Sequence, residues 1–164
     1  MNILITGASG FVGGRFMLRF ADRGDLAIHG VGRRSLNVPN YTRIDLGEPF
    51  DLTVSPDVVI HAAARATPWG RATDYQRDNV EATRNVIDFC VRRGLPRLVY
   101  VSSSSVLYQR GHQFNLTEDS PMGPRFMNDY AATKFAAEQL VRAYPGPWVI
   151  VRPRAVFGPG DTVL

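Results

Sequence analysis

Three glycines spaced three residues apart constrain the fold of this chain more than any other feature. They lie in the segment Thr6-Gly7-Ala8-Ser9-Gly10-Phe11-Val12-Gly13, between an apolar stretch and an amphipathic one. Such a turn between a strand and a helix lets the backbone approach a pyrophosphate, which then binds the free N–H groups at the start of the helix. A glycine-rich turn without a ligand is the alternative, but the position between strand and helix favours dinucleotide binding.

Short apolar, β-branched segments alternate with helical patterns along the rest of the chain. Strands are predicted at residues 2–6, 27–31, 42–44, 58–61, 98–102 and 148–152, and helices at 10–23, 74–93 and 128–144. This alternation predicts an α/β fold, a Rossmann-type doubly wound parallel sheet whose crossovers are right-handed. The segment 33–57 is too short and too rich in Pro, Asn and Asp for a full crossover helix, so we expect a reduced loop there.

Composition limits the class of protein. A chain of 164 residues with 45% hydrophobic and 21% charged residues is typical of one soluble domain, here residues 1–164. No apolar run is long enough to span a bilayer, and a predicted strand follows Met1 at once, so we expect no membrane partner and no signal peptide. The single cysteine, Cys90, fits a reducing compartment, and we predict a cytoplasmic location. The net charge of +4 comes from scattered residues, so no nucleic-acid partner is expected, and no metal site is predicted.

One lysine stands out among the cations. Of the 19 basic residues, 18 are arginine, and Lys134 is the exception. It follows Tyr130 by four residues, which places both side chains on one face of a predicted helix with Asn128 as its N-cap. A nearby ammonium favours the phenolate form of a tyrosine, so this pair suits proton transfer to or from an alcohol or ketone.

A run of four serines supplies a third group for this chemistry. Residues 102–105 follow the predicted strand 98–102, and the carboxyl ends of parallel strands face the crevice in which ligands bind. One of these hydroxyls is expected to hold the substrate oxygen beside Tyr130. A serine run or a Tyr-x-x-x-Lys spacing is common by chance, but their order behind the glycine turn favours a shared site.

The end of the second predicted strand bears on the choice of cofactor. An acidic residue there would accept the 2′-hydroxyl of NAD, but the sequence reads Val31-Gly32-Arg33-Arg34. A guanidinium binds a phosphate with two parallel hydrogen bonds. Arg33 therefore predicts NADP, with NAD as the second choice. The alternative is that both arginines are exposed loop cations.

The motifs together resemble the extended short-chain dehydrogenase/reductase family, also called the NAD-dependent epimerase/dehydratase family. The resemblance covers essentially the whole chain, with the glycine segment as nucleotide motif and Tyr130 to Lys134 as catalytic motif. It implies three catalytic residues, Ser104, Tyr130 and Lys134. It implies cofactor contacts from Gly7, Gly10, Phe11, Val12, Gly13, Arg33, Asp45, Leu46, Ala62, Ala63, Ala64, Asn79, Tyr130, Lys134 and Pro153.

Two residues and the length of the chain also bear on this resemblance. His61 precedes the Ala62–Ala64 segment, and we expect it to end a buried strand without acid–base duty. Gln109 stands where the family commonly has glycine. Members of the family usually run to about twice this length, so the C-terminal substrate-binding portion is expected to be missing and the chain alone to have little turnover.

The predicted function is that of an NAD(P)-dependent epimerase, dehydratase or reductase. It transfers hydride between nicotinamide and a hydroxyl or carbonyl carbon, with Tyr130 as acid and base. The partners are a small-molecule substrate, either a sugar nucleotide or another hydroxy or keto compound, and a second copy of the chain in a homodimer. The alternative is a non-catalytic NADP-binding redox sensor, although such relatives tend to lose the Tyr-x-x-x-Lys motif that this chain retains.

Overall fold

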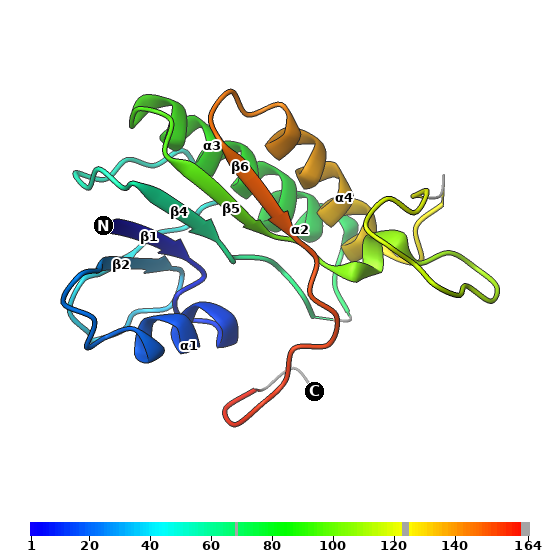
Figure 1. Ribbon diagram of the computed structural model, residues 1–164, viewed down its shortest axis with the longest axis horizontal. Coiled ribbons are helices and arrows are strands. Elements are labelled where there is room, and N and C mark those ends of the chain that lie inside the picture. Colours follow the sequence, from blue (N-terminus) through cyan, green and yellow to red (C-terminus); the bar gives the residue numbers. More distant parts are fainter. Residues whose placement is uncertain (68, 123–124, 162–164) are drawn as a thin grey trace.

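A six-stranded, all-parallel sheet forms the centre of the molecule (Figure 1). The computed structural model describes residues 1–67, 69–122 and 125–161, and the end of the predicted domain, 162–164, lies outside this part. The strands are β1 (Asn2–Thr6), β2 (Ala27–Gly32), β3 (Tyr41–Arg43), β4 (Val58–His61), β5 (Arg97–Val101) and β6 (Trp148–Val151). The helices are α1 (Phe11–Arg19), α2 (Ala72–Tyr75), the π-helix η1 (Gln76–Glu81), α3 (Ala82–Arg92), the 3-10 helix η2 (Ser104–Leu107) and α4 (Asp129–Arg142).

The strand order confirms the predicted doubly wound topology. The order is β3-β2-β1-β4-β5-β6, so the chain first moves away from β1 in one direction and then in the other. Helix α1 packs against β2 on one face of the sheet, and α3 and α4 pack against β4, β5 and β6 on the opposite face. The reversal leaves a crevice beyond the carboxyl end of β1, which is where open α/β sheets bind ligands.

The helix predicted at 74–93 proved to be three successive elements. Helices α2, η1 and α3 follow one another without a break. The π-helical part buries Asp78, Asn79 and Val80 consecutively, whereas a regular amphipathic helix buries residues three and four positions apart. Apolar periodicity could not reveal this wider turn, because two of the three buried residues are polar.

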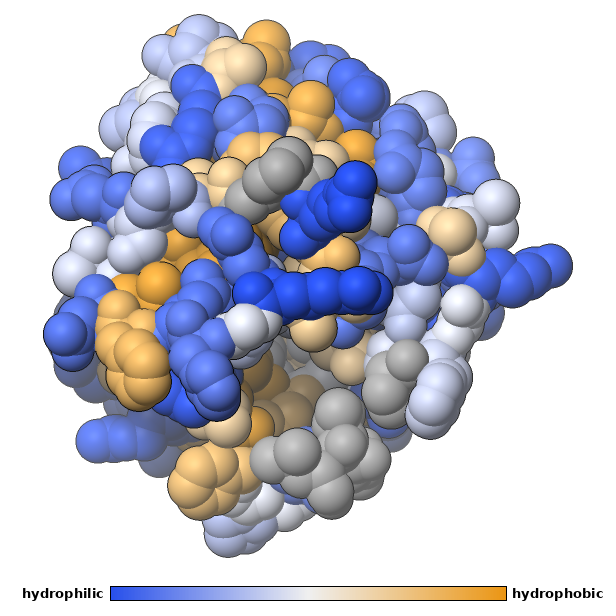
Figure 2. Space-filling model, turned by 90° about the vertical axis from the view of Figure 1, so that its right-hand side faces the viewer, coloured by the Kyte–Doolittle hydropathy of each residue, from blue (hydrophilic) through white to orange (hydrophobic). Residues whose placement is uncertain are grey.

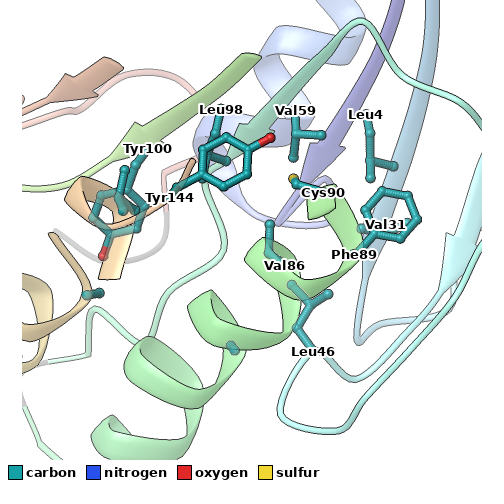
Figure 3. Packing of buried hydrophobic residues seen from close by; sticks show 13 residues of the cluster. Leu4, Val31, Leu46, Val59, Val86, Phe89, Cys90, Leu98, Tyr100 and Tyr144 are labelled. Carbon is teal, nitrogen blue, oxygen red and sulfur yellow. The ribbon is translucent and has the colours of Figure 1, made fainter. Parts of the chain in front are cut away.

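The main hydrophobic core lies between the sheet and α3 (Figure 3). Fully buried side chains of four strands meet Val86, Phe89 and Cys90 of α3. The expected reduced loop is confirmed, since the chain between β3 and β4 contains no helix and packs its own apolar residues on this core. Phe50 of that loop stacks on Phe89 with ring centroids 5.2 Å apart. Burial raises the pKa of the Cys90 thiol to about 12, so this thiol stays protonated at neutral pH.

The opposite face of β6 is less covered than its apolar sequence predicts. Val149 and Val151 point away from α4 and are 42% and 39% exposed. A parallel strand this apolar is expected to be buried on both faces. Within the described residues, no side chain of β6 is fully buried: on the α4 side Ile150 packs against the core and Trp148 is 37% exposed.

A buried ion pair fastens α4 to β6. The carboxylate of Glu138 is fully buried and accepts hydrogen bonds from Arg152 Nε at 2.9 Å and Nη2 at 2.7 Å. Ser102, just after β5, donates to the same carboxylate at 2.6 Å. Because the Arg152 side chain is itself only 8% exposed, the guanidinium and the carboxylate are each other's counter-charge in the interior of the protein. The pair therefore holds together the elements that carry the serine run and the Tyr130–Lys134 pair.

Replacing Glu138 with glutamine should lower the free energy of unfolding by about 3–5 kcal/mol, because it leaves the buried Arg152 guanidinium without a counter-charge. Urea denaturation of the full protein measures this loss. The matched control is Arg142→Gln, since Arg142 lies 3.8 Å from the same carboxylate and is 42% exposed. It should change stability by less than about 1 kcal/mol. Equal losses for the two variants would contradict the assigned role of the pair.

Candidate functional site

The glycine turn after β1 has the geometry that its sequence predicts. Gly7 has a positive φ of 70°, and a side chain there would meet the Ala63 nitrogen at 2.8 Å. A side chain at Gly13 would overlap the Gly7 carbonyl oxygen, so the first turn of α1 packs directly on the loop. Gly10 precedes α1 as its N-cap and donates its N–H to Gly7 oxygen at 2.8 Å. Only residues without a β-carbon allow this close packing of backbone on backbone.

A cavity of about 190 Å³ opens beside this turn, at the point where the strand order reverses. Predicted cofactor residues that line it are Gly7, Gly10, Arg33, Asp45, Leu46, Ala62, Ala63 and Ala64. Ser9 and Asp78 also line it, although sequence reasoning assigned them no role. The predicted contacts Phe11, Val12, Gly13, Asn79, Tyr130, Lys134 and Pro153 lie outside its lining. The cavity, with the turn and the predicted adenosine contacts in its wall, fits the adenosine and pyrophosphate end of a dinucleotide.

The two charged residues predicted at this end are both ion-paired. Asp45 accepts from Arg77 Nη2 at 2.7 Å, and this hydrogen bond holds the pKa of the Asp45 carboxyl below its usual value. Arg33 is 54% exposed and places Nη1 3.0 Å from Asp78 of η1. No acidic residue directly follows β2 in the sequence. In the folded chain, the carboxylate beside Arg33 is instead that of Asp78, which belongs to η1.

A chain of buried hydrogen bonds runs from the glycine turn through His61. Thr83 donates its one hydroxyl hydrogen to the Asn79 carbonyl at 2.6 Å, so it accepts from His61 Nε2 at 3.0 Å. Burial, together with the charge of Lys134, lowers the pKa of His61 to about 3, so the imidazole is neutral and Nδ1 accepts from Thr6 at 2.7 Å. The proton on Nε2 is thus assigned by the network. His61 fixes the end of β4, as expected, and its ring nitrogens both serve structural bonds.

Asn79 continues this chain to the catalytic helix. Its amide accepts from Arg65 N–H at 2.7 Å and donates to Thr133 Oγ1 at 3.0 Å, and Thr133 donates in turn to the Asp129 carbonyl at 2.7 Å. Asn79 is 1% exposed. Its amide therefore ties the loop after β4 to the first turn of α4, and its contact with a dinucleotide stays a prediction.

Lys134 lies one helical turn after Tyr130 in α4, and its side chain points into the interior of the protein. Its ammonium donates to the Val101 carbonyl at 2.6 Å and lies 4.2 Å from the centre of the Tyr100 ring. The side chain is fully enclosed, and burial lowers the pKa of Lys134 to about 7 despite the opposing influence of Glu138.

The start of α4 packs against η2, on the side of the molecule that faces the viewer in Figure 2; the arrows of β4, β5 and β6 in Figure 1 point toward this side. Asn128 caps α4 as predicted, by accepting from Ala131 N–H at 2.9 Å. Burial raises the pKa of Tyr130, and a hydrogen bond with Ser103 partly offsets this. The expected lowering of this pKa by Lys134 is absent from the structure, because the ammonium is engaged by Val101 and Tyr100.

The serines make local hydrogen bonds. Ser103 Oγ accepts from Ser105 N–H at 3.2 Å, and Ser104 Oγ lies 2.9 Å from the hydroxyl of Tyr108. The catalytic role of Ser104 stays a prediction. Ser104 N–H donates to the Pro153 carbonyl at 3.0 Å, so Pro153 does lie beside the serine loop. Gln109, which replaces the family's usual glycine, bonds to Gln113 and Pro121 and ties down the following loop.

Sequence reasoning missed several polar residues that organise the site, among them Asp78, Glu138 and Tyr108. Glu138 had a detectable signal, because it follows Lys134 by four residues and so shares its helix face. Tyr108 follows Ser104 by the same interval. Asp78 had no such signal in the sequence, because its partner Arg33 lies 45 residues away.

Comparison with known proteins places the chain in a family. The sequence profile of the NAD dependent epimerase/dehydratase family matches residues 3–163, so the chain belongs to that family. It is 35% identical over its whole length to a 2-alkyl-3-oxoalkanoate reductase of Stenotrophomonas maltophilia, of which it covers 53%. It is 33% identical over 99% of its length to the sterol-4-alpha-carboxylate 3-dehydrogenase of Saccharomyces cerevisiae, of which it again covers 53%.

Solved structures agree with the fold. MoeE5, in a complex with UDP-glucose and NAD, superposes with a TM-score of 0.80 and 32% sequence identity, covering 98% of this chain and 56% of that one. The chain thus spans about half the length of the relatives that it matches. No helix in residues 1–67, 69–122 or 125–161 has both the length and the apolar character to span a membrane.

Replacing Lys134 with methionine should raise the free energy of unfolding at pH 7, and this gain should shrink as the pH approaches 10. The pKa of Lys134 is about 7 in the folded protein and about 10.4 in an unfolded chain. The unfolded state therefore binds more protons between these values, and wild-type stability rises with pH by up to about 1.4 kcal/mol per unit from this group. Urea denaturation at pH 7, 8, 9 and 10 measures the difference.

The control for this series is Arg142→Met, which removes an exposed cation from the same helix. Its stability difference from the wild type should stay constant over the same pH range, because arginine does not titrate there. A pH-independent difference for Lys134→Met would show that the ammonium remains charged when the protein is folded.

Proposed function

We propose that the protein carrying this chain is a nicotinamide-dependent oxidoreductase that acts on a hydroxyl or carbonyl carbon, with Tyr130 as the proton donor and acceptor. The observation that supports it best is that Lys134 points inward beside the serine loop. Its helix, α4, is connected through Thr133 and a series of buried hydrogen bonds to Thr6, which precedes the glycine turn. The nicotinamide supplies hydride transfer when it is bound. The chain's own residues then hold the substrate oxygen and move one proton.

The proton-transfer role assigns a separate task to each residue. In the direction of reduction the Tyr130 hydroxyl gives its proton to a ketone oxygen; in the direction of oxidation the Tyr130 phenolate takes the proton of an alcohol. Ser104 and its neighbour Ser103 orient that oxygen through hydrogen bonds. Because Tyr130 has a raised pKa in this structure, it is protonated at neutral pH, which suits a donor in the direction of reduction. Lys134 supplies a positive charge close by and donors for a ribose hydroxyl.

The relatives narrow the substrate class. The names of the 2-alkyl-3-oxoalkanoate reductase and the sterol-4-alpha-carboxylate 3-dehydrogenase both describe redox chemistry at carbon 3 of a molecule that also has a carboxylate. MoeE5 binds UDP-glucose. We propose a ketone or secondary alcohol of a small molecule as the reacting group, with a sugar nucleotide as the other candidate. A non-catalytic redox sensor is less consistent with the retained tyrosine and lysine. The homodimer and the cytoplasmic location stay predictions.

Tyr130→Phe should lower kcat by roughly 10²- to 10⁴-fold in the full protein, because the ring remains and the transferable proton is lost. Steady-state reduction of a 3-oxoalkanoate and turnover of a UDP-sugar measure this. The matched control is Tyr144→Phe, which removes a hydroxyl just beyond the C-terminal end of α4, where it donates to the Pro96 carbonyl. Its kcat should stay within about two-fold. Unchanged turnover in Tyr130→Phe would eliminate the acid–base role.

We further propose that NADP is the preferred cofactor, with Arg33 as a donor to the 2′-phosphate. Arg33 lines the cavity and is more than half exposed. Arg33→Ala should weaken NADPH binding by about ten-fold or more, the loss expected for one hydrogen bond between charged groups, and leave NADH binding nearly unchanged. Fluorescence titration measures both. Arg23→Ala, which removes a cation paired with Asp25, is the control for net charge. Tighter binding of NADH, with no effect of Arg33→Ala, would refute the assignment.

A further inference from the structure

A buried carboxylate stands on the wall of the adenosine cavity opposite Arg33. Asp78 belongs to η1, which follows β4, whereas Arg33 follows β2, and β1 lies between these two strands in the sheet. Both residues line the same cavity. The Arg33 side chain therefore reaches across the crevice to contact Asp78, with Nη1 3.1 Å from Oδ1 and 3.0 Å from Oδ2.

Asp78 is held in place by more than this one contact. Arg65 donates Nε to Asp78 Oδ2 at 3.0 Å, and Arg77 donates Nη1 to Oδ1 at 3.3 Å. The Asp78 side chain is 7% exposed, against 26% for Arg65, 39% for Arg77 and 54% for Arg33. The carboxylate is thus the fixed member of the cluster, and Arg33 is its most solvent-exposed partner.

A 2′-phosphate and Asp78 would compete for the same guanidinium. Arg33 uses only Nη1 for Asp78, so Nε and Nη2 remain to donate to a ligand. A phosphate that binds there shares its cation with a carboxylate and approaches that carboxylate's negative charge. NAD has a neutral hydroxyl at this position and meets neither penalty. Asp78 therefore acts more strongly against NADP than against NAD.

We infer that Asp78 is a specificity-determining residue that weakens the binding of the 2′-phosphate through Arg33, so that the site accepts NAD(H) as well as NADP(H). This inference rests on the proposed contact between Arg33 and the 2′-phosphate. It accounts for a cavity that combines an NADP-type arginine after β2 with a fold shared by NAD-bound relatives such as MoeE5. Arg65 and Arg77 keep the acid in place, and Arg33 transmits its effect to the ligand.

The test compares Asp78→Asn with the wild type in the full protein. Asparagine keeps the shape and one acceptor oxygen but removes the charge. Dissociation constants are measured for NADPH and NADH, and for adenosine 2′,5′-bisphosphate and 5′-AMP, which probe the adenosine end alone. The NADPH-to-NADH affinity ratio should rise by about three- to ten-fold, and the bisphosphate-to-AMP ratio should rise with it. An unchanged or smaller ratio would overturn the inference.

Two further variants separate this effect from others. Glu81→Gln removes a charge from the same π-helix, where Glu81 pairs with Arg84, and should leave both ratios unchanged. In an Arg33→Ala background, Asp78→Asn should have at most a small effect. An equal rise in that background would mean that Asp78 does not act through Arg33, which also overturns the inference. Asp78→Ser serves the same comparisons if Asp78→Asn fails to fold.

Failure of the proposed cofactor is recognised separately. If Arg33→Ala by itself leaves NADPH binding unchanged, the NADP assignment falls, and this inference falls with it. If Arg33→Ala weakens NADPH binding but Asp78→Asn does not raise the ratio, the assignment stands and the role of Asp78 is refuted.

Discussion

The contact of the glycine turn with the loop after β4 is the constraint on which the binding crevice depends. The Gly7 backbone lies so close to Ala62 and Ala63 that no side chain fits between them. This closeness brings the start of α1 and the ends of β1 and β4 to one point. The cavity beside that point exists because the strand order reverses there and leaves the crevice uncovered by a crossover.

Buried polar bonds then connect this crevice to α4, the helix that carries Tyr130 and Lys134. Thr6, His61, Thr83, Asn79 and Thr133 form one hydrogen-bonded series from β1 to α4, in which the buried imidazole of His61 is neutral. A half-satisfied network in such a place would cost stability. Because each of these five side chains has a partner, the series fixes the position of the helix that carries Tyr130 relative to the glycine turn.

Much of the fold was accessible from local patterns, and the misses have physical causes. The strands Asn2–Thr6 and Val58–His61 were predicted to the residue, since β-branched runs bounded by turn residues mark them. The ends of the other strands shifted by at most one residue. The π-helix was missed because its buried residues include Asp78 and Asn79, whose burial depends on partners distant in the sequence.

The sequence by itself determined the doubly wound fold, the glycine turn and the shared helix face of Tyr130 and Lys134, because these follow from backbone geometry and short-range spacing. The sequence also shows that no acidic residue directly follows β2. Only the tertiary structure decided that the Asp78 carboxylate pairs with Arg33 from the other side of the crevice. It likewise decided that Lys134 is buried deeply enough for its pKa to fall to about 7. Ion pairing and desolvation depend on which distant residues meet, and spacing along one chain does not specify that.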